Sequence, residues 1–89
     1  MALNISSANA QIRRLKQQSA AASHCARSLS AYKEQLTCSW SGIEVDYLCK
    51  AIDQQIRKCE TLSADLDRLS RSMAQAVEDI LLEESILSE

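Results

Sequence analysis

The feature that most constrains the fold is a pair of long apolar heptad patterns in a chain that has no proline and a single glycine. On both sides of Gly42, apolar side chains recur at spacings of three and four residues, which is the pattern of one apolar face on a helix. Glycine and proline are the residues that most often end a helix, so the chain can reverse only near Gly42. The sequence therefore predicts an all-α antiparallel helical hairpin, with helices at about 4–38 and 42–87 and a turn at 39–42.

The turn contains the only Trp of the chain, in the segment Trp40-Ser41-Gly42. Ser41 followed three residues later by Glu44 is a capping-box pattern, which predicts that Ser41 is the N-cap of the second helix. In that register Trp40 and Val45 form a hydrophobic staple, with the indole as a buried wedge in the elbow. Gly42 would then lie in the first turn, where the missing side chain allows the indole or the other helix to come close.

The first arm carries its apolar stripe through five heptads, which predicts one continuous helix. Its a sites are Ile5, Ile12, Ser19, Ala26 and Lys33, and its d sites are Ala8, Leu15, Ala22, Leu29 and Leu36. The stretch from Ser19 to Ser23 has only small side chains, which permit close approach of a neighbouring helix but provide little apolar area.

The second arm has a wider apolar stripe. Its a sites are Val45, Ile52, Cys59, Leu66, Met73, Ile80 and Leu87, and Leu48, Leu62, Leu69 and Ala76 occupy d sites. Cys49, Ile56 and Val77 extend the stripe on its e side, which favours a helix with neighbours on two sides and hence a four-helix bundle made of two hairpins. We expect the dimer or partner interface to comprise Ile12, Leu15, Ala22, Leu29, Leu36, Leu48, Ile52, Ile56, Leu62, Leu66, Leu69 and Met73.

Length and charge exclude several classes of protein. The 89 residues fit one domain, residues 1–89, whose stability is expected to need a partner. Residues 1–42 carry five basic and one acidic residue, and residues 43–89 carry five and eleven, so the halves have formal charges of +4 and −6 and attract each other. Basic residues without aromatic or Gly interleaving in an acidic chain do not favour nucleic-acid binding. Neither a membrane-inserted segment nor a cleavable signal peptide is expected.

The cysteines and the single histidine do not form a recognisable metal or catalytic pattern. Intervals of ten to thirteen residues between the four cysteines fit no zinc motif, and His24 falls on an outward heptad position without a second histidine. We expect no cofactor, no metal and no enzyme activity. Packing is the simplest role for the cysteines, but Cys25 and Cys59 are level on opposite arms and could form a disulfide in an oxidising compartment.

The C-terminal segment is expected to extend past the first arm. It combines apolar residues with acids at a helix C-terminus, where the macrodipole disfavours negative charge. Two interpretations stay open for this tail: a segment bound by another molecule, or a slightly overlong core helix.

A chain of this length, with two long helices joined at a central Trp40-Ser41-Gly42, resembles the WXG100 family of small helical hairpin proteins exported by type VII secretion systems. In that family an aromatic residue often lies about two turns into the second helix; Leu48 has that position here, next to Tyr47. The family's C-terminal signal has a Tyr followed four residues later by an acid, and Ile80 with Glu84 keeps the spacing but replaces the aromatic residue.

The resemblance implies a non-enzymatic protein that is cytoplasmic before export and is then secreted without a cleavable signal peptide. It acts either as an exported dimer or as a helical partner and targeting chaperone for a larger exported protein, such as a toxin with its own N-terminal hairpin. The implied partners are a second copy or related hairpin, and a secretion ATPase that recognises a docking tail of Ile80, Leu81 and Glu84. The alternative function is a cytosolic coiled-coil adaptor with no role in secretion.

Overall fold

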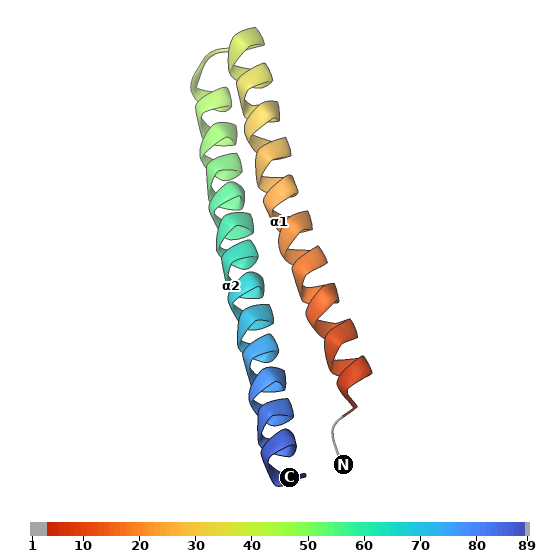
Figure 1. Cartoon of the computed structure of the whole chain (residues 1–89). Coiled ribbons are helices and arrows are strands. Elements are labelled where there is room, and N and C mark those ends of the chain that lie inside the picture. Colours follow the sequence, from red (N-terminus) through yellow and green to blue (C-terminus); the bar gives the residue numbers. More distant parts are fainter. Residues whose placement is uncertain (1–3, 89) are drawn as a thin grey trace.

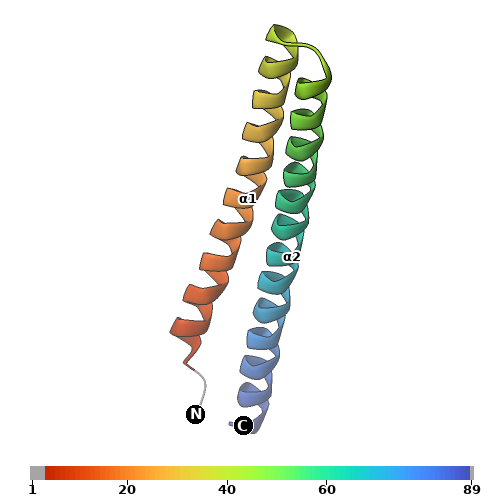
Figure 2. The same ribbon diagram turned by 180° about the vertical axis from the view of Figure 1, so that it is seen from behind.

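The computed structural model describes residues 4–88, which form two helices and no strand. Helix α1 spans Ile5–Ser39 and helix α2 spans Ile43–Leu87, and the two lie side by side and antiparallel (Figures 1 and 2). The molecule measures 71 × 15 × 15 Å, the dimensions of a rod two helices wide. The prediction of an all-α helical hairpin is confirmed.

The ends of α1 are capped by local hydrogen bonds. At the N-terminus the Asn4 side chain is the N-cap and accepts a hydrogen bond of 3.0 Å from the backbone N–H of Ser7. This bond satisfies one of the donors that the first turn of a helix leaves unpaired. At the other end the backbone N–H of Trp40 donates to the carbonyl oxygen of Leu36 at 2.9 Å, and the chain then becomes extended.

The start of α2 corrects the predicted capping box. Gly42 is the N-cap, and within residues 4–88 no side chain makes a cap hydrogen bond there, so the prediction that Ser41 caps the helix is wrong. The first helical bond runs from the N–H of Asp46 to the carbonyl oxygen of Gly42, one residue later than the capping box requires. Glu44 and Asp46 still favour this end of α2, because their charges oppose the positive end of the helix dipole.

The roles assigned to Trp40 and Gly42 are also corrected. Trp40 is 66% exposed and lies at the extended residue after α1, so its indole is not a buried wedge. A Cβ added to Gly42 would meet no described atom within 4 Å, so close packing does not explain the glycine. Its backbone does, because φ of 123° with ψ of 178° is a conformation that residues with a side chain rarely adopt.

The core is a narrow band between the helices. It contains the buried apolar residues Ile12, Ala22, Ala26, Val45, Cys49, Ile52 and Val77, together with the buried serines Ser19 and Ser70. On α1 these residues occupy the expected a and d sites. On α2 they occupy the a and e sites, so the side of α2 that faces α1 is rotated away from the predicted d row.

Two serines fasten the helices to each other near the middle of the rod. The Ser19 hydroxyl donates to the carbonyl oxygen of Ser63 at 2.7 Å, and the Ser63 hydroxyl donates to the carbonyl oxygen of Ser19 at 2.9 Å. Such reciprocal bonds to the backbone require that the two helices approach closely, and a side chain as small as serine permits this. The prediction of close approach in the small-residue stretch thus has a specific counterpart on α2.

A second connection lies nearer the turn. The Lys33 ammonium pairs with the Asp53 carboxylate at 2.7 and 3.0 Å to its two oxygens, and this bond raises the pKa of Lys33, opposed by partial desolvation. At the opposite end of the rod the helices diverge, and α2 continues beyond the first turn of α1 (Figures 1 and 2). The C-terminal segment of α2 therefore lacks α1 as a neighbour.

Candidate partner-binding face

The predicted d row of α2 lies at the exposed edge of the helix pair and not in its buried core. Leu48, Leu62 and Leu69 are 43%, 52% and 49% exposed, although each belongs to the apolar stripe read from the sequence. Their spacings of fourteen and seven residues keep them in one row along the helix, which a second hairpin could cover. Between residues 48 and 69 of α2, these three leucines are the large apolar side chains that remain exposed.

Residues of α1 continue this row across the groove between the helices. Around Leu62 a shallow hollow is lined mainly by apolar side chains from both helices: Gln18, Ala21, Ala22, Cys25, Cys59, Leu62 and Leu66. Near the turn a second hollow is lined by Tyr32, Leu36, Trp40, Glu44, Val45 and Leu48. We call the residues of these two hollows, together with Leu69, the apolar face of the hairpin.

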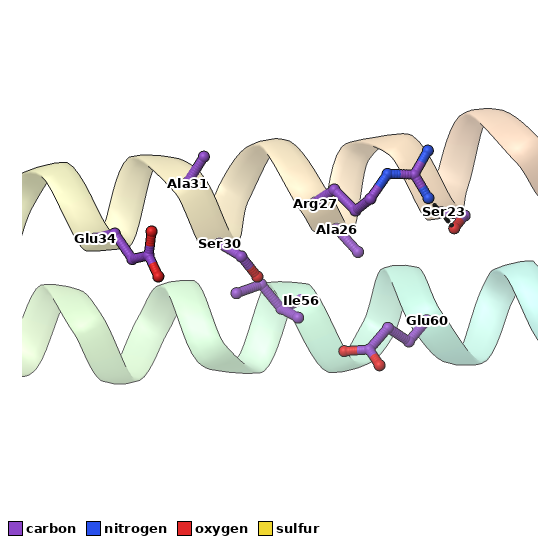
Figure 3. A pocket seen from close by; sticks show the side chains of 8 residues that line it. All are labelled: Ser23, Ala26, Arg27, Ser30, Ala31, Glu34, Ile56 and Glu60. Atoms are coloured by element: carbon purple, nitrogen blue, oxygen red, sulfur yellow. Dashed lines mark hydrogen bonds between the residues drawn. The ribbon is translucent and has the colours of Figure 1, made fainter.

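The other side of the groove has a different character. A hollow there is lined by Ser23, Ala26, Arg27, Ser30, Ala31, Glu34, Ile56 and Glu60. Figure 3 shows Ile56 rising from α2 toward Ser30, with the carboxylates of Glu34 and Glu60 on either side, while the Arg27 guanidinium donates to the Ser23 hydroxyl at 3.0 Å. Charged groups at its rim and small side chains at its base are typical of a solvated surface, so the hairpin has one apolar and one polar face.

The structure divides the predicted interface residues into three groups. Ile12, Ala22 and Ile52 are buried within the hairpin, Leu15, Leu29, Leu36, Ile56, Leu66 and Met73 are half-buried, and Leu48, Leu62 and Leu69 are exposed. The side chains of the first group pack between α1 and α2 and are not accessible to a partner. The exposed leucines and the half-buried residues beside the two apolar hollows are the ones available to a partner.

The turn and the tail also expose apolar side chains. Trp40, Ser41 and Gly42 form the connection between the helices, and the Trp40 indole lines the hollow that ends at Leu48. In the tail, Leu81 is exposed, whereas Ile80 and Glu84 are half-buried. The largest exposed apolar area beyond Ile80 belongs instead to Leu82, Ile86 and Leu87.

Sequence reasoning missed the residues that decide which side of α2 faces inward. Ser63 and Ser70 occupy the e row with Cys49, Ile56 and Val77, and Ser70 is completely buried, its hydroxyl donating to the carbonyl oxygen of Asp67. The sequence contains a signal for this orientation of α2, because small residues recur every seven residues on the e side of the apolar stripe. A heptad pattern treats serine as polar, although a serine whose hydroxyl bonds to the backbone packs like a small core residue.

The remaining chemistry of the surface is modest. Among residues 4–88 no group of three or more His, Cys, Asp or Glu side chains is arranged to hold a metal ion. His24, Cys25 and Cys38 are exposed, Cys49 is buried and Cys59 is half-buried. No helix in the described part of the chain has the length and apolar character needed to cross a membrane.

Comparison of the chain with protein-family models, with curated proteins and with solved structures found no match in any of the three.

Proposed function

We propose that the protein is a non-enzymatic helical hairpin of the WXG100 type that works by pairing with a second copy along the apolar face. The pair is a four-helix bundle that serves as a component of a type VII secretion system, either exported itself or carrying a larger exported protein. The observation that supports this most directly is the exposed row of Leu48, Leu62 and Leu69 beside the apolar hollows of the groove.

The large solvent-exposed surface of the hairpin supports the proposal that a partner covers part of it. The hairpin exposes 6775 Å², whereas a compact folded monomer of its mass exposes about 5,200 Å². Its radius of gyration is 20.2 Å, against about 12 Å for a compact domain of this length. A standard protein interface needs about 800 Å² from each partner, and the apolar face extends along the rod from the turn to Leu69. The hairpin thus has both the area and the apolar character to form such an interface.

The charge distribution favours a second copy as the partner. The half of the chain that contains α1 has a formal charge of +4 and the half that contains α2 has −6. In a two-fold symmetric pair, α1 of one copy can lie on α2 of the other, so both contacts bring opposite charges together. The alternative pairing of α2 on α2 would place the leucine rows together but would also bring two negative helices into contact.

Assignment to secretion rests on the resemblance at the turn. The tripeptide Trp40-Ser41-Gly42 lies between two arms of the expected length, and the exposed indole is free to contact another molecule. The tail of α2 is helical without α1 beside it and presents Leu81, Leu82 and Ile86, which suits docking to a secretion ATPase. The competing function is a coiled-coil adaptor, which would use the same face but would stay in the cytosol.

The pairing is tested by charge substitutions on two sides of α2. Leu62→Glu with Leu69→Glu places two carboxylates in the proposed interface, and we expect the purified protein to become monomeric while its helical content persists. Ala64→Glu, at an exposed position of the same helix off the apolar face, is the matched control and should stay paired. Pairing that survives the double substitution would show that the apolar face is not the interface.

Export is tested separately in the producing cell. We expect the protein in the culture medium when the secretion ATPase is intact and only in the cell when that ATPase is inactivated. Equal retention in both strains would support the adaptor function instead.

A further inference from the structure

Two of the four cysteines lie together across the helix interface. Cys25 of α1 and Cys59 of α2 line the same shallow hollow, with Ala22 and Leu62 beside them. All four cysteines are within the described residues and are free thiols, and the other two are Cys38, which is exposed near the turn, and Cys49, which is buried. Only the first pair therefore shares a surface hollow that a small reagent can reach.

The register of the helices is fixed on both sides of this pair. The reciprocal hydrogen bonds of Ser19 and Ser63 lie toward the open end of the rod, and the ion pair of Lys33 and Asp53 lies toward the turn. Contacts on both sides hold the two backbones level at the cysteines. A disulfide needs Cα atoms at about 4.4–6.8 Å and Cβ atoms facing each other, and facing positions on closely packed helices can meet this with little backbone movement.

We propose that Cys25 and Cys59 form an intramolecular disulfide that locks α1 to α2 when the protein meets a small-molecule disulfide oxidant such as oxidised glutathione. The two thiols are a modification site at which oxidation converts a hairpin held by noncovalent contacts into a covalently closed one. This proposal does not depend on the proposed function, although an exported protein would meet such conditions outside the reducing cytosol.

The reaction is two thiol–disulfide exchanges. The exposed Cys25, as the thiolate, attacks one sulfur of the oxidant, and the S–S bond of the oxidant breaks to release one thiolate. Cys59, as the thiolate, then attacks the Cys25 sulfur of the mixed disulfide and releases the second half of the oxidant. The protein loses two electrons and two protons, and the oxidant gains both as two thiols.

The environment of Cys59 sets the order of these two steps. Its interaction with the Cys25 thiol, followed by partial desolvation and by charge repulsion from Cys25, raises the pKa of Cys59. While Cys25 is a free thiol, less of the Cys59 thiol is therefore ionised, which makes Cys59 the poorer nucleophile for the first attack on the oxidant. Cys25 is the more exposed of the two and is the natural site of the first attack.

The test uses the full chain at low concentration in buffers of oxidised and reduced glutathione. We expect a chain that is not covalently linked to a second copy and is lighter by two hydrogen atoms. Peptide mapping should join Cys25 to Cys59 while Cys38 and Cys49 stay reduced. Closing a loop of about 35 residues removes freedom from the unfolded chain, so the melting temperature should rise on the order of 10 °C.

Matched variants separate this disulfide from other oxidation. Cys25→Ser should abolish the mass change and the rise in melting temperature, whereas Cys38→Ser should leave both intact. The proposal is overturned if the thiols stay reduced in the oxidised buffer, if peptide mapping finds a different pair, or if the cysteines of two copies join instead. It is also overturned if Cys25→Ser keeps the same gain in melting temperature on oxidation.

Discussion

Substitutions at the turn distinguish a helix start fixed by a glycine conformation from one fixed by a serine cap. Gly42 has φ of 123° and ψ of 178°, a region that is essentially restricted to glycine. Holding another residue there costs about 1–3 kcal/mol, and alanine returns about 0.4–1 kcal/mol by restricting the unfolded chain. We therefore expect Gly42→Ala to lower the free energy of unfolding by about 1–2 kcal/mol, although its methyl group would contact nothing in the described chain.

Substitutions of Ser41 and a second substitution of Gly42 distinguish the two explanations of the helix start. Ser41→Ala should change the free energy of unfolding very little, because the Ser41 hydroxyl makes no cap hydrogen bond among the described residues. A serine N-cap, by contrast, is worth about 0.5–2 kcal/mol. Gly42→Asn should be about as harmful as Gly42→Ala, since asparagine tolerates the left-handed helical region but not this extended one.

The assay is urea unfolding followed by far-ultraviolet circular dichroism, with all proteins at one concentration because pairing would make stability depend on it. The slope of the free energy against urea should be the same for each variant, so that the midpoints can be compared. If Ser41→Ala costs more than about 1 kcal/mol and Gly42→Ala costs nothing, the helix starts at the serine and the corrected register is wrong.

Three other predictions concern the contacts between the helices and the exposed indole. Ser63→Leu should lower the free energy of unfolding by about 2–4 kcal/mol through overpacking and lost hydrogen bonds. Ser72→Leu, at an exposed site, should have little effect. Equal losses in urea unfolding would contradict the close approach of the two helices at Ser63. Because the pair with Asp53 raises the pKa of Lys33, the stabilisation from this pair is fully present below the ordinary lysine pKa of 10.5 and is lost as the pH rises through the folded pKa. Lys33→Met should therefore flatten the alkaline part of a plot of melting temperature against pH. In the unpaired L62E/L69E protein, Trp40→Ala should change the melting temperature by no more than a few degrees, because the indole is exposed. In the otherwise unchanged chain, the same substitution should weaken pairing in sedimentation experiments.

The helical hairpin was predictable because its determinants are periodic and local. Heptads on both sides of Gly42 with no proline leave little alternative to two long helices, and helix–helix register follows from the position of the turn. Two pairs of residues lie on opposite helices as that register requires: the hydrogen-bonded serines Ser19 and Ser63, and the cysteines Cys25 and Cys59. What the sequence could not give directly was the rotation of α2 about its own axis.

That rotation depends on a competition between size and polarity. Leucines at d offer more apolar area than serines at e, so a count of apolar residues favours the d row as the core. The structure instead brings Ser63 and Ser70 inward, where small side chains let the backbones approach and the hydroxyls bond to carbonyl groups, and it leaves Leu62 and Leu69 outside. Sequence periodicity finds the stripe, but it does not show which edge is covered by the same chain.

The turn shows a similar competition between two local signals. Ser41 with Glu44 fits a capping box, while the adjacent Gly42 fits a backbone conformation closed to other residues, and the two cannot both define the helix start. Gly42 begins α2, and Trp40 consequently lies one residue outside the staple register, with its indole exposed. The same shift turns the indole from a predicted part of the core into a candidate contact for a partner.

We propose that a second hairpin covers the apolar face, and sedimentation equilibrium of the unmodified, reduced protein tests this pairing most directly. A chain of 9.9 kDa should sediment as a species of twice that mass at micromolar concentration, and Leu62→Glu with Leu69→Glu should return it to the mass of one chain. A single-chain mass for the unmodified protein over the whole concentration range would contradict the claim.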